Sequence, residues 1–82
     1  MSYFVYILEC NNKALYTGIT TDLKRRFEEH ISGKGGAYTR SHLPVKIRYY
    51  EMTGSRSTAL KREAEIKSWP RNKKLALIKR NP

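Results

Sequence analysis

Two tyrosines, an arginine, a histidine and a glutamate are the residues of this chain whose types and spacing suit phosphodiester chemistry. Tyr6 and Tyr16 fall in neighbouring strand-like segments, and Arg26 and His30 follow, four residues apart, in a helical pattern. Glu63 lies far along the chain, on the apolar side of a second helical pattern. A single carboxylate is enough to hold Mg²⁺, and an arginine stabilises the charge on a reacting phosphate. The set therefore suits metal-assisted hydrolysis.

The charge of the chain indicates a polyanionic partner. Its 82 residues include 17 Lys and Arg against 7 Asp and Glu, a formal net charge of +10. The excess is concentrated in residues 54–82, with nine basic and two acidic side chains. Such a field attracts a nucleic acid backbone. A membrane is not expected as a partner, because the aromatic rings fall in strand patterns and not on a basic amphipathic helix.

The cysteine and histidine content excludes small domains that are stabilised by internal disulfides or by a structural zinc ion. One cysteine, Cys10, allows no internal disulfide, and two histidines give no zinc-ligand spacing. The opening apolar run, residues 3–8, is too short for a signal peptide and lacks basic residues before it. We therefore expect a cytoplasmic protein whose mature chain begins at or near Met1. With 82 residues we expect one domain, 1–82, and a monomer by default.

A predicted β-hairpin would position the two tyrosines. Residues 3–8 are apolar on both alternate faces, which indicates a central strand, and residues 14–19 return antiparallel to them. A two-residue turn at Asn11-Asn12 would place Tyr6 and Tyr16 on opposite faces. We predict instead a three-residue loop, 10–12, with Asn12 in the left-handed region, which pairs Tyr6 with Tyr16 on one face. Core packing is the alternative role for both rings.

The other side chains depend on two predicted helices. A helix from near Asp22 would bury Leu23, Phe27 and Ile31 and leave Arg26 and His30 on the adjoining face, where an ordinary solvated flank is the alternative. A second helix, from residues 55–58 to about residue 69, would turn Glu63 inward. An inward carboxylate is costly unless it is paired or binds a cation, so Glu63 either forms a salt bridge with an arginine at the edge of the core, such as Arg26, or is a metal ligand.

The remaining segments complete an α+β fold. We predict an edge strand over residues 46–52, with Ile47 and Tyr49 on one face. We predict loops over residues 32–44 and a last helix that begins at Pro70. The expected fold is a three-stranded antiparallel sheet flanked by helices, in the order β-β-α-β-α-α. The side chains expected to bind nucleic acid are Lys34, Tyr38, Arg40, Lys67, Arg71, Lys73 and Lys74.

The ordered set of motifs resembles the GIY-YIG endonuclease domain, and most closely its small stand-alone members. The resemblance rests on residues 4–6 (Phe-Val-Tyr), residues 16–18 (Tyr-Thr-Gly), an arginine eight residues after that glycine, a histidine one turn on, and a glutamate in a later helix. It implies cleavage with one Mg²⁺ or Mn²⁺ ion. The implied roles are Tyr16 as base, Tyr6 as its partner, Arg26 as phosphate clamp, His30 as a positioning group and Glu63 as metal ligand.

Some positions depart from the family pattern. Phe4 replaces the first glycine, Thr17 stands where isoleucine or valine is frequent, and Thr21 stands where some members have lysine. A late asparagine has no secure counterpart, because Asn72 and Asn81 both lie in the basic tail.

Three functions follow as hypotheses. The first is a metal-dependent endonuclease that hydrolyses structured or branched DNA in repair or recombination, with DNA favoured over RNA as the substrate. The second is a nucleic-acid-binding module that keeps the scaffold without the chemistry. The third is a basic accessory protein of a ribonucleoprotein particle.

Overall fold

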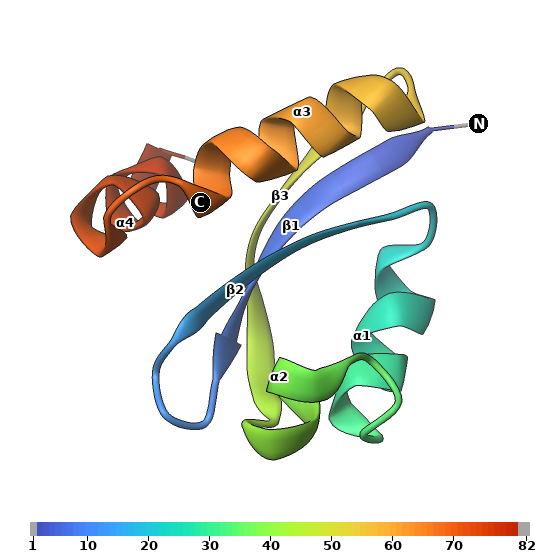
Figure 1. Cartoon of the computed structure of the whole chain (residues 1–82), viewed down its shortest axis with the longest axis vertical. Helices are drawn as coiled ribbons and strands as arrows, with labels where there is room; N and C mark the ends of the chain where they lie inside the picture. The colour runs from blue at the N-terminus through green and yellow to red at the C-terminus, as the bar shows by residue number, and fades with distance from the viewer. Residues whose placement is uncertain (1, 81–82) are drawn as a thin grey trace.

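The computed structural model describes residues 2–80, which form a three-stranded antiparallel sheet with helices on both faces. The elements follow the order β1 (Tyr3–Cys10), β2 (Leu15–Thr20), α1 (Leu23–Ile31), α2 (Ala37–Ser41), β3 (Pro44–Thr53), α3 (Arg56–Lys67) and α4 (Arg71–Arg80). The strand order is β2-β1-β3, so β1 is central and β3 is an edge strand. In Figure 1, α3 and α4 lie on one side of the sheet and α1 and α2 on the other. The predicted α+β fold is confirmed.

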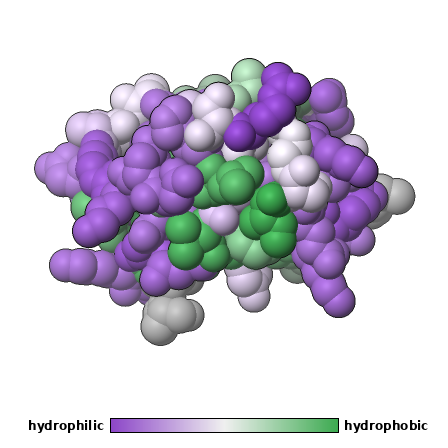
Figure 2. Space-filling view, turned by 90° about the horizontal axis from the view of Figure 1, so that it is seen from below, coloured by the Kyte–Doolittle hydropathy of each residue, from purple (hydrophilic) through white to green (hydrophobic). Residues whose placement is uncertain are grey.

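The main core lies between the sheet and the pair α3 and α4. Its buried members are Val5, Ile7, Tyr49, Ala59, Ile66, Leu77 and Ile78. Figure 2 views the opposite, α1 and α2 side of the molecule, where hydrophilic side chains surround a small apolar patch. Every helix within residues 2–80 is too short or too polar to cross a bilayer.

The hairpin has the predicted loop length but a different register. The loop is Asn11 to Lys13, and Lys13, not Asn12, takes the left-handed conformation at φ 68°. The direct pairing of Tyr6 with Tyr16 was wrong, since Tyr6 pairs with Gly18 and Tyr16 with Leu8. Because the register differs by two residues and side chains alternate with period two, both tyrosines still lie on one face.

The first helix begins as predicted but buries a different side chain. Asp22 is its N-cap, and the carboxylate accepts a hydrogen bond from the Arg25 amide at 3.0 Å. Ile31, predicted to be buried, is 44% exposed, whereas His30 is the buried residue of α1. The reason is that α2, in a segment predicted as loop, covers the histidine. Five residues are too few to show a helical period in the sequence.

A bulge in β3 places Ile47 and Tyr49 on opposite faces of the sheet, so the prediction that they share one face was wrong. Tyr49 pairs with Ile7, but Ile47 pairs with Leu8, so the register shifts between these two pairs. The extra residue turns Ile47 toward α1, while Tyr49 joins the core under α3.

Candidate active site

Tyr6 and His30 form the buried centre of the candidate site. Tyr6 on β1 is 2% exposed, and its hydroxyl lies 2.9 Å from Nε2 of the fully buried His30. Nδ1 of His30 lies 2.8 Å from Oγ1 of Thr39 on α2. The Thr39 hydroxyl donates to the Gly36 carbonyl, so its oxygen accepts the Nδ1 proton of a neutral ring. This pattern assigns Nε2 as the acceptor of the Tyr6 proton.

The protonation of this pair follows from its burial. Burial raises the pKa of Tyr6 to about 12, because loss of hydration opposes the phenolate more than the neighbouring Arg26 guanidinium favours it. Burial, followed by the positive charge of Arg26, lowers the pKa of His30 below its ordinary 6.5. At neutral pH both groups are uncharged, so Tyr6 is poorly suited to take a proton from water.

Acid is expected to destabilise the fold through His30. Because the folded pKa of His30 is lowered, the unfolded chain takes up the proton first as the pH falls. The stability is therefore complete above pH 6.5 and declines below it, by at most about 1.4 kcal/mol per pH unit. Urea unfolding between about pH 7.5 and 5.5 measures this slope, in a window above the titration of ordinary carboxylates. The His30→Gln variant should lose this slope, whereas the matched control His42→Gln should keep it. A slope in His30→Gln equal to that of the unmodified protein would contradict the assignment.

Two glycines make room for the pair. A Cβ at Gly18 would lie 2.5 Å from the Tyr6 hydroxyl, so the Tyr6 ring reaches across β2 only because this residue has no side chain. Gly35, in the loop before α2, faces the His30 ring in the same way. Gly18 and Gly35 therefore both allow close packing at the site.

Gly35→Ala is expected to lower the free energy of unfolding by about 1–3 kcal/mol, the usual cost of overpacking. The new Cβ would lie 2.1 Å from Nδ1 of His30 and 2.8 Å from its Cα, so backbone has to move as well as the ring. Gly54→Ala is the control, because nothing lies within 4 Å of its Cβ position. Thermal unfolding compares the two variants. Equal stability of both would show that the loop adapts without cost.

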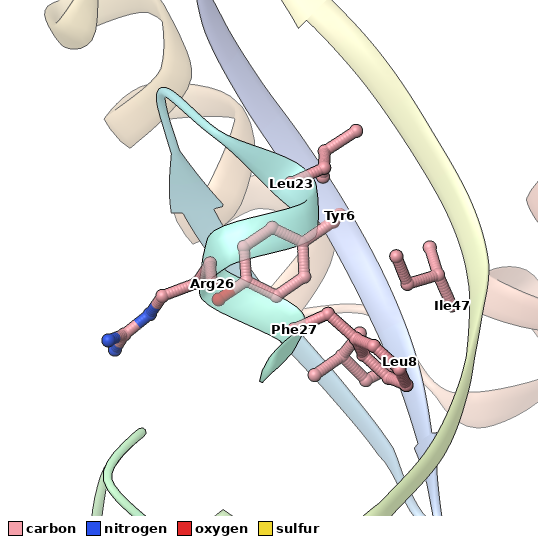
Figure 3. Close-up of a pocket in the computed structure, with 6 residues that line it drawn as sticks. All are labelled: Tyr6, Leu8, Leu23, Arg26, Phe27 and Ile47. Carbon is pink, nitrogen blue, oxygen red and sulfur yellow. The ribbon is translucent and has the colours of Figure 1, made fainter. Parts of the chain in front are cut away.

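Arg26 is held at the boundary between this centre and solvent. Its Nη2 donates to the Gly35 carbonyl at 2.8 Å and its Nη1 pairs with Glu29 at 3.0 Å. In Figure 3 the Tyr6 ring lies against α1, while the Arg26 guanidinium extends out of the pocket. With its side chain 31% exposed, Arg26 is accessible to a phosphate. The loop before α2 therefore positions both Arg26 and His30.

Tyr16 lies beside the buried pair and is more open to solvent. Its ring centroid is 5.3 Å from that of His30, in edge contact, and the Tyr38 ring is stacked parallel to it at 6.3 Å. The Lys67 ammonium lies 5.8 Å from the centroid of the Tyr16 ring. Tyr16 is partly exposed, in contrast to Tyr6. Of the two tyrosines, it is the one that is accessible to solvent.

Glu63 approaches the tyrosines from α3, which packs along β2. Its carboxylate pairs with Lys67 at 3.3 Å, and the same ammonium faces Tyr16. The negative charge of Glu63 makes a small contribution to the raised pKa of Tyr6, which is due mainly to burial. The predicted salt-bridge alternative with Arg26 is wrong, because Arg26 pairs with Glu29 and Glu63 with Lys67.

The donor set fits a hard cation that keeps most of its water. Across residues 2–80 the fold gathers no group of three or more His, Cys, Asp or Glu side chains that could hold a metal ion. Mg²⁺ is commonly bound by one or two carboxylates, with water and phosphate oxygens as the other ligands. The side chain of Glu63 is 19% exposed, and its partner Lys67 is a surface residue, so the carboxylate is accessible to such an ion.

The side chains predicted to bind nucleic acid are only partly gathered at the site. Lys67 and Tyr38 contact Tyr16 directly, and Lys34 and Arg40 are exposed in and just before α2. The other three, Arg71, Lys73 and Lys74, are on α4, and the Lys73 ammonium lies 4.5 Å from the Trp69 ring centroid. No contact described within residues 2–80 links these three to the tyrosines.

Sequence reasoning missed Thr39, Gly18 and Gly35 as residues that position the site. Gly35 lies in residues 32–44, the segment predicted as loops, and the three glycines of that segment were the available signal. Thr39 gave no signal, because its segment was predicted as loop.

Comparison with known proteins identifies the family of the chain. The GIY-YIG catalytic domain family matches residues 2–76. A UPF0213 protein of Syntrophus aciditrophicus is 56% identical over 80 residues, covering 96% of this chain and 92% of the relative. One of Haloquadratum walsbyi is 51% identical over 75 residues, covering 92% of this chain and 84% of the relative. The solution NMR structure of a UPF0213 protein from Bacillus halodurans has a TM-score of 0.64 at 41% identity, covering 99% of this chain and 86% of that one. The chain therefore belongs to the GIY-YIG family of nuclease domains, together with these UPF0213 proteins.

Proposed function

We propose that residues 1–82 form one nuclease domain, a metal-dependent endonuclease that hydrolyses phosphodiester bonds in structured or branched DNA, in repair or recombination. The observation that supports it best is the meeting of three elements at β2. Tyr16 lies on β2, His30 and the exposed Arg26 come from α1, and the Glu63 and Lys67 pair comes from α3.

In this proposal Tyr16 is the base. Its phenolate oxygen accepts a proton from water while the water oxygen forms a bond to phosphorus. The bond from phosphorus to the leaving oxygen breaks, and that oxygen takes a proton from solvent. Tyr6 is excluded as the base by its burial, its raised pKa and the bond that holds its proton to His30. The Lys67 ammonium faces the Tyr16 ring and so lies beside the negative charge of the phenolate, which is lost as the proton is taken up.

The other side chains hold the phosphate. Arg26 donates to the non-bridging oxygens, and its bond to the Gly35 carbonyl fixes the guanidinium before substrate arrives. His30 supports Tyr6 and the ring of Tyr16 by packing between them and α2. Glu63 would hold Mg²⁺ or Mn²⁺, which as a Lewis acid would stabilise charge on the phosphate oxygens.

A substrate recognised by its shape suits the surface of the chain. Most of the basic side chains predicted to contact nucleic acid are exposed lysines and arginines, which bind phosphates without reading base sequence. Branched, flapped and single-stranded DNA present phosphates in arrangements that a regular duplex lacks. This supports structured DNA as the preferred substrate.

Labelled branched, flapped and linear DNA, incubated with the purified protein, tests the proposal. We expect cleavage of the branched or flapped substrates with Mg²⁺ or Mn²⁺ and none with EDTA. Salt-sensitive binding without products in any metal would support the binding module instead. Co-sedimentation with ribosomes, without cleavage of free DNA or RNA, would support the ribonucleoprotein accessory protein.

A further inference from the structure

A cleft lined by arginines opens beside the candidate site, where β2 ends and the first turns of α1 and α3 approach each other. It is a shallow cleft of about 350 Å³ whose polar lining is Thr20, Thr21, Arg25, Arg26, Glu29 and Arg56. Arg25 and Arg26 begin α1, whereas Arg56 begins α3, thirty residues later. No local pattern in the sequence groups these three arginines.

The charges in the cleft favour an anion. Three guanidinium groups face one carboxylate, Glu29, and that carboxylate is already paired with Arg26. No ion pair within residues 2–80 engages Arg25 or Arg56, and both side chains are exposed. Planar guanidinium groups bind phosphate through two parallel hydrogen bonds. The cleft therefore suits an anion with several oxygens, such as the phosphate of a nucleic acid backbone, better than a chloride ion.

Arg26 connects the cleft to the catalytic groups. It lines this cleft and also the narrow pocket that holds the Tyr6 ring (Figure 3). Thr20 at the cleft and Tyr16 at the other end of β2 are four residues apart, which is about 13 Å along a strand. That length corresponds to about four steps of a DNA strand along the duplex axis.

We propose that this cleft binds a second phosphate of the substrate strand, up to about four nucleotides from the phosphate that Arg26 holds for cleavage. The strand then runs along β2, an edge strand of the sheet, with Arg25 and Arg56 at one end and Tyr16 with Lys67 at the other. This inference rests on the proposed function, because it assumes a nucleic acid substrate. The contact is to the backbone, so it adds affinity and orients the strand without sequence preference.

Arg25→Gln, Arg56→Gln and the double variant test the proposal. Binding of labelled branched DNA is measured in EDTA across a salt series, with Arg80→Gln on α4 as the matched control for loss of one positive charge. Each neutralised phosphate contributes about 0.9 to the slope of log affinity against log salt, and the cleft holds one phosphate, so the double variant should lose about 0.9. Arg25→Lys should keep the slope of the unmodified protein.

Cleavage separates this proposal from the proposed function. With Mg²⁺ the double variant should show a raised KM and an unchanged kcat. Slopes and KM values equal to those of Arg80→Gln would overturn the cleft as a phosphate site, even if the protein cleaves DNA. A lowered slope in a protein that never cleaves DNA would leave the cleft supported and overturn the nuclease. Thermal unfolding of all variants verifies that they fold.

Discussion

Glu63→Gln is expected to reduce cleavage by at least about 100-fold while DNA binding in EDTA remains. The substitution keeps the size of the side chain and removes the charge that a divalent cation needs. It also frees Lys67, which adds positive charge at the site, so binding should be unchanged or slightly tighter. Single-turnover cleavage with saturating protein and Mg²⁺ measures the loss, and binding is measured separately without metal.

Glu28→Gln is the matched control for the same loss of charge. Glu28 is exposed on α1, and no ion pair described within residues 2–80 includes it. Its cleavage rate should equal that of the unmodified protein. If Glu63→Gln cleaves as fast as Glu28→Gln, the carboxylate does not take part, and the cation would have to be held elsewhere.

Tyr16→Phe is expected to lower the cleavage rate constant by about 10²–10⁴-fold, the usual contribution of a general base. The ring packs on His30 and Tyr38 through its faces and edge, so removal of the hydroxyl should leave the fold intact. The loss should appear in the single-turnover rate and not in DNA affinity. The melting temperature should stay close to that of the unmodified protein.

Tyr6→Phe distinguishes the two tyrosines. Its hydroxyl is buried and bonded to His30, so the variant leaves Nε2 without a partner and should lose about 1–3 kcal/mol of stability. We therefore expect a lower melting temperature for Tyr6→Phe and a lower rate with normal stability for Tyr16→Phe. Full activity of Tyr16→Phe together with an inactive but stably folded Tyr6→Phe would assign the base to Tyr6 instead.

The candidate site is a junction and not a deep cavity. Its side chains come from β1, β2, α1 and α3, and Thr39 on α2 completes the buried pair. The accessible members are Arg26, Tyr16 and the Glu63 and Lys67 pair, at the edge of the sheet. A nucleic acid backbone reaches such an edge without entering a pocket, which agrees with the arginine cleft beside it.

Local sequence determined the elements and the residues that carry chemistry. Asp22 and Ser55 cap α1 and α3 as their side chains predict, and the apolar run of β1 gives a strand buried on both faces. Tyr6 and Tyr16 lie on one face as predicted even though the register was wrong, because side chains alternate between faces and a shift of two residues keeps each side chain on its face. The family was also evident from the order of its motifs.

Tertiary structure alone decided how these residues meet. The burial of His30 depends on α2, which is too short to have a period, and the separation of Ile47 from Tyr49 depends on one bulge. The partner of Glu63 and the meeting of Arg25 with Arg56 depend on how α3 packs along β2. Spacing along a chain fixes faces and caps, because these are local. Contacts between elements depend on packing against neighbours distant in sequence, which no local pattern encodes.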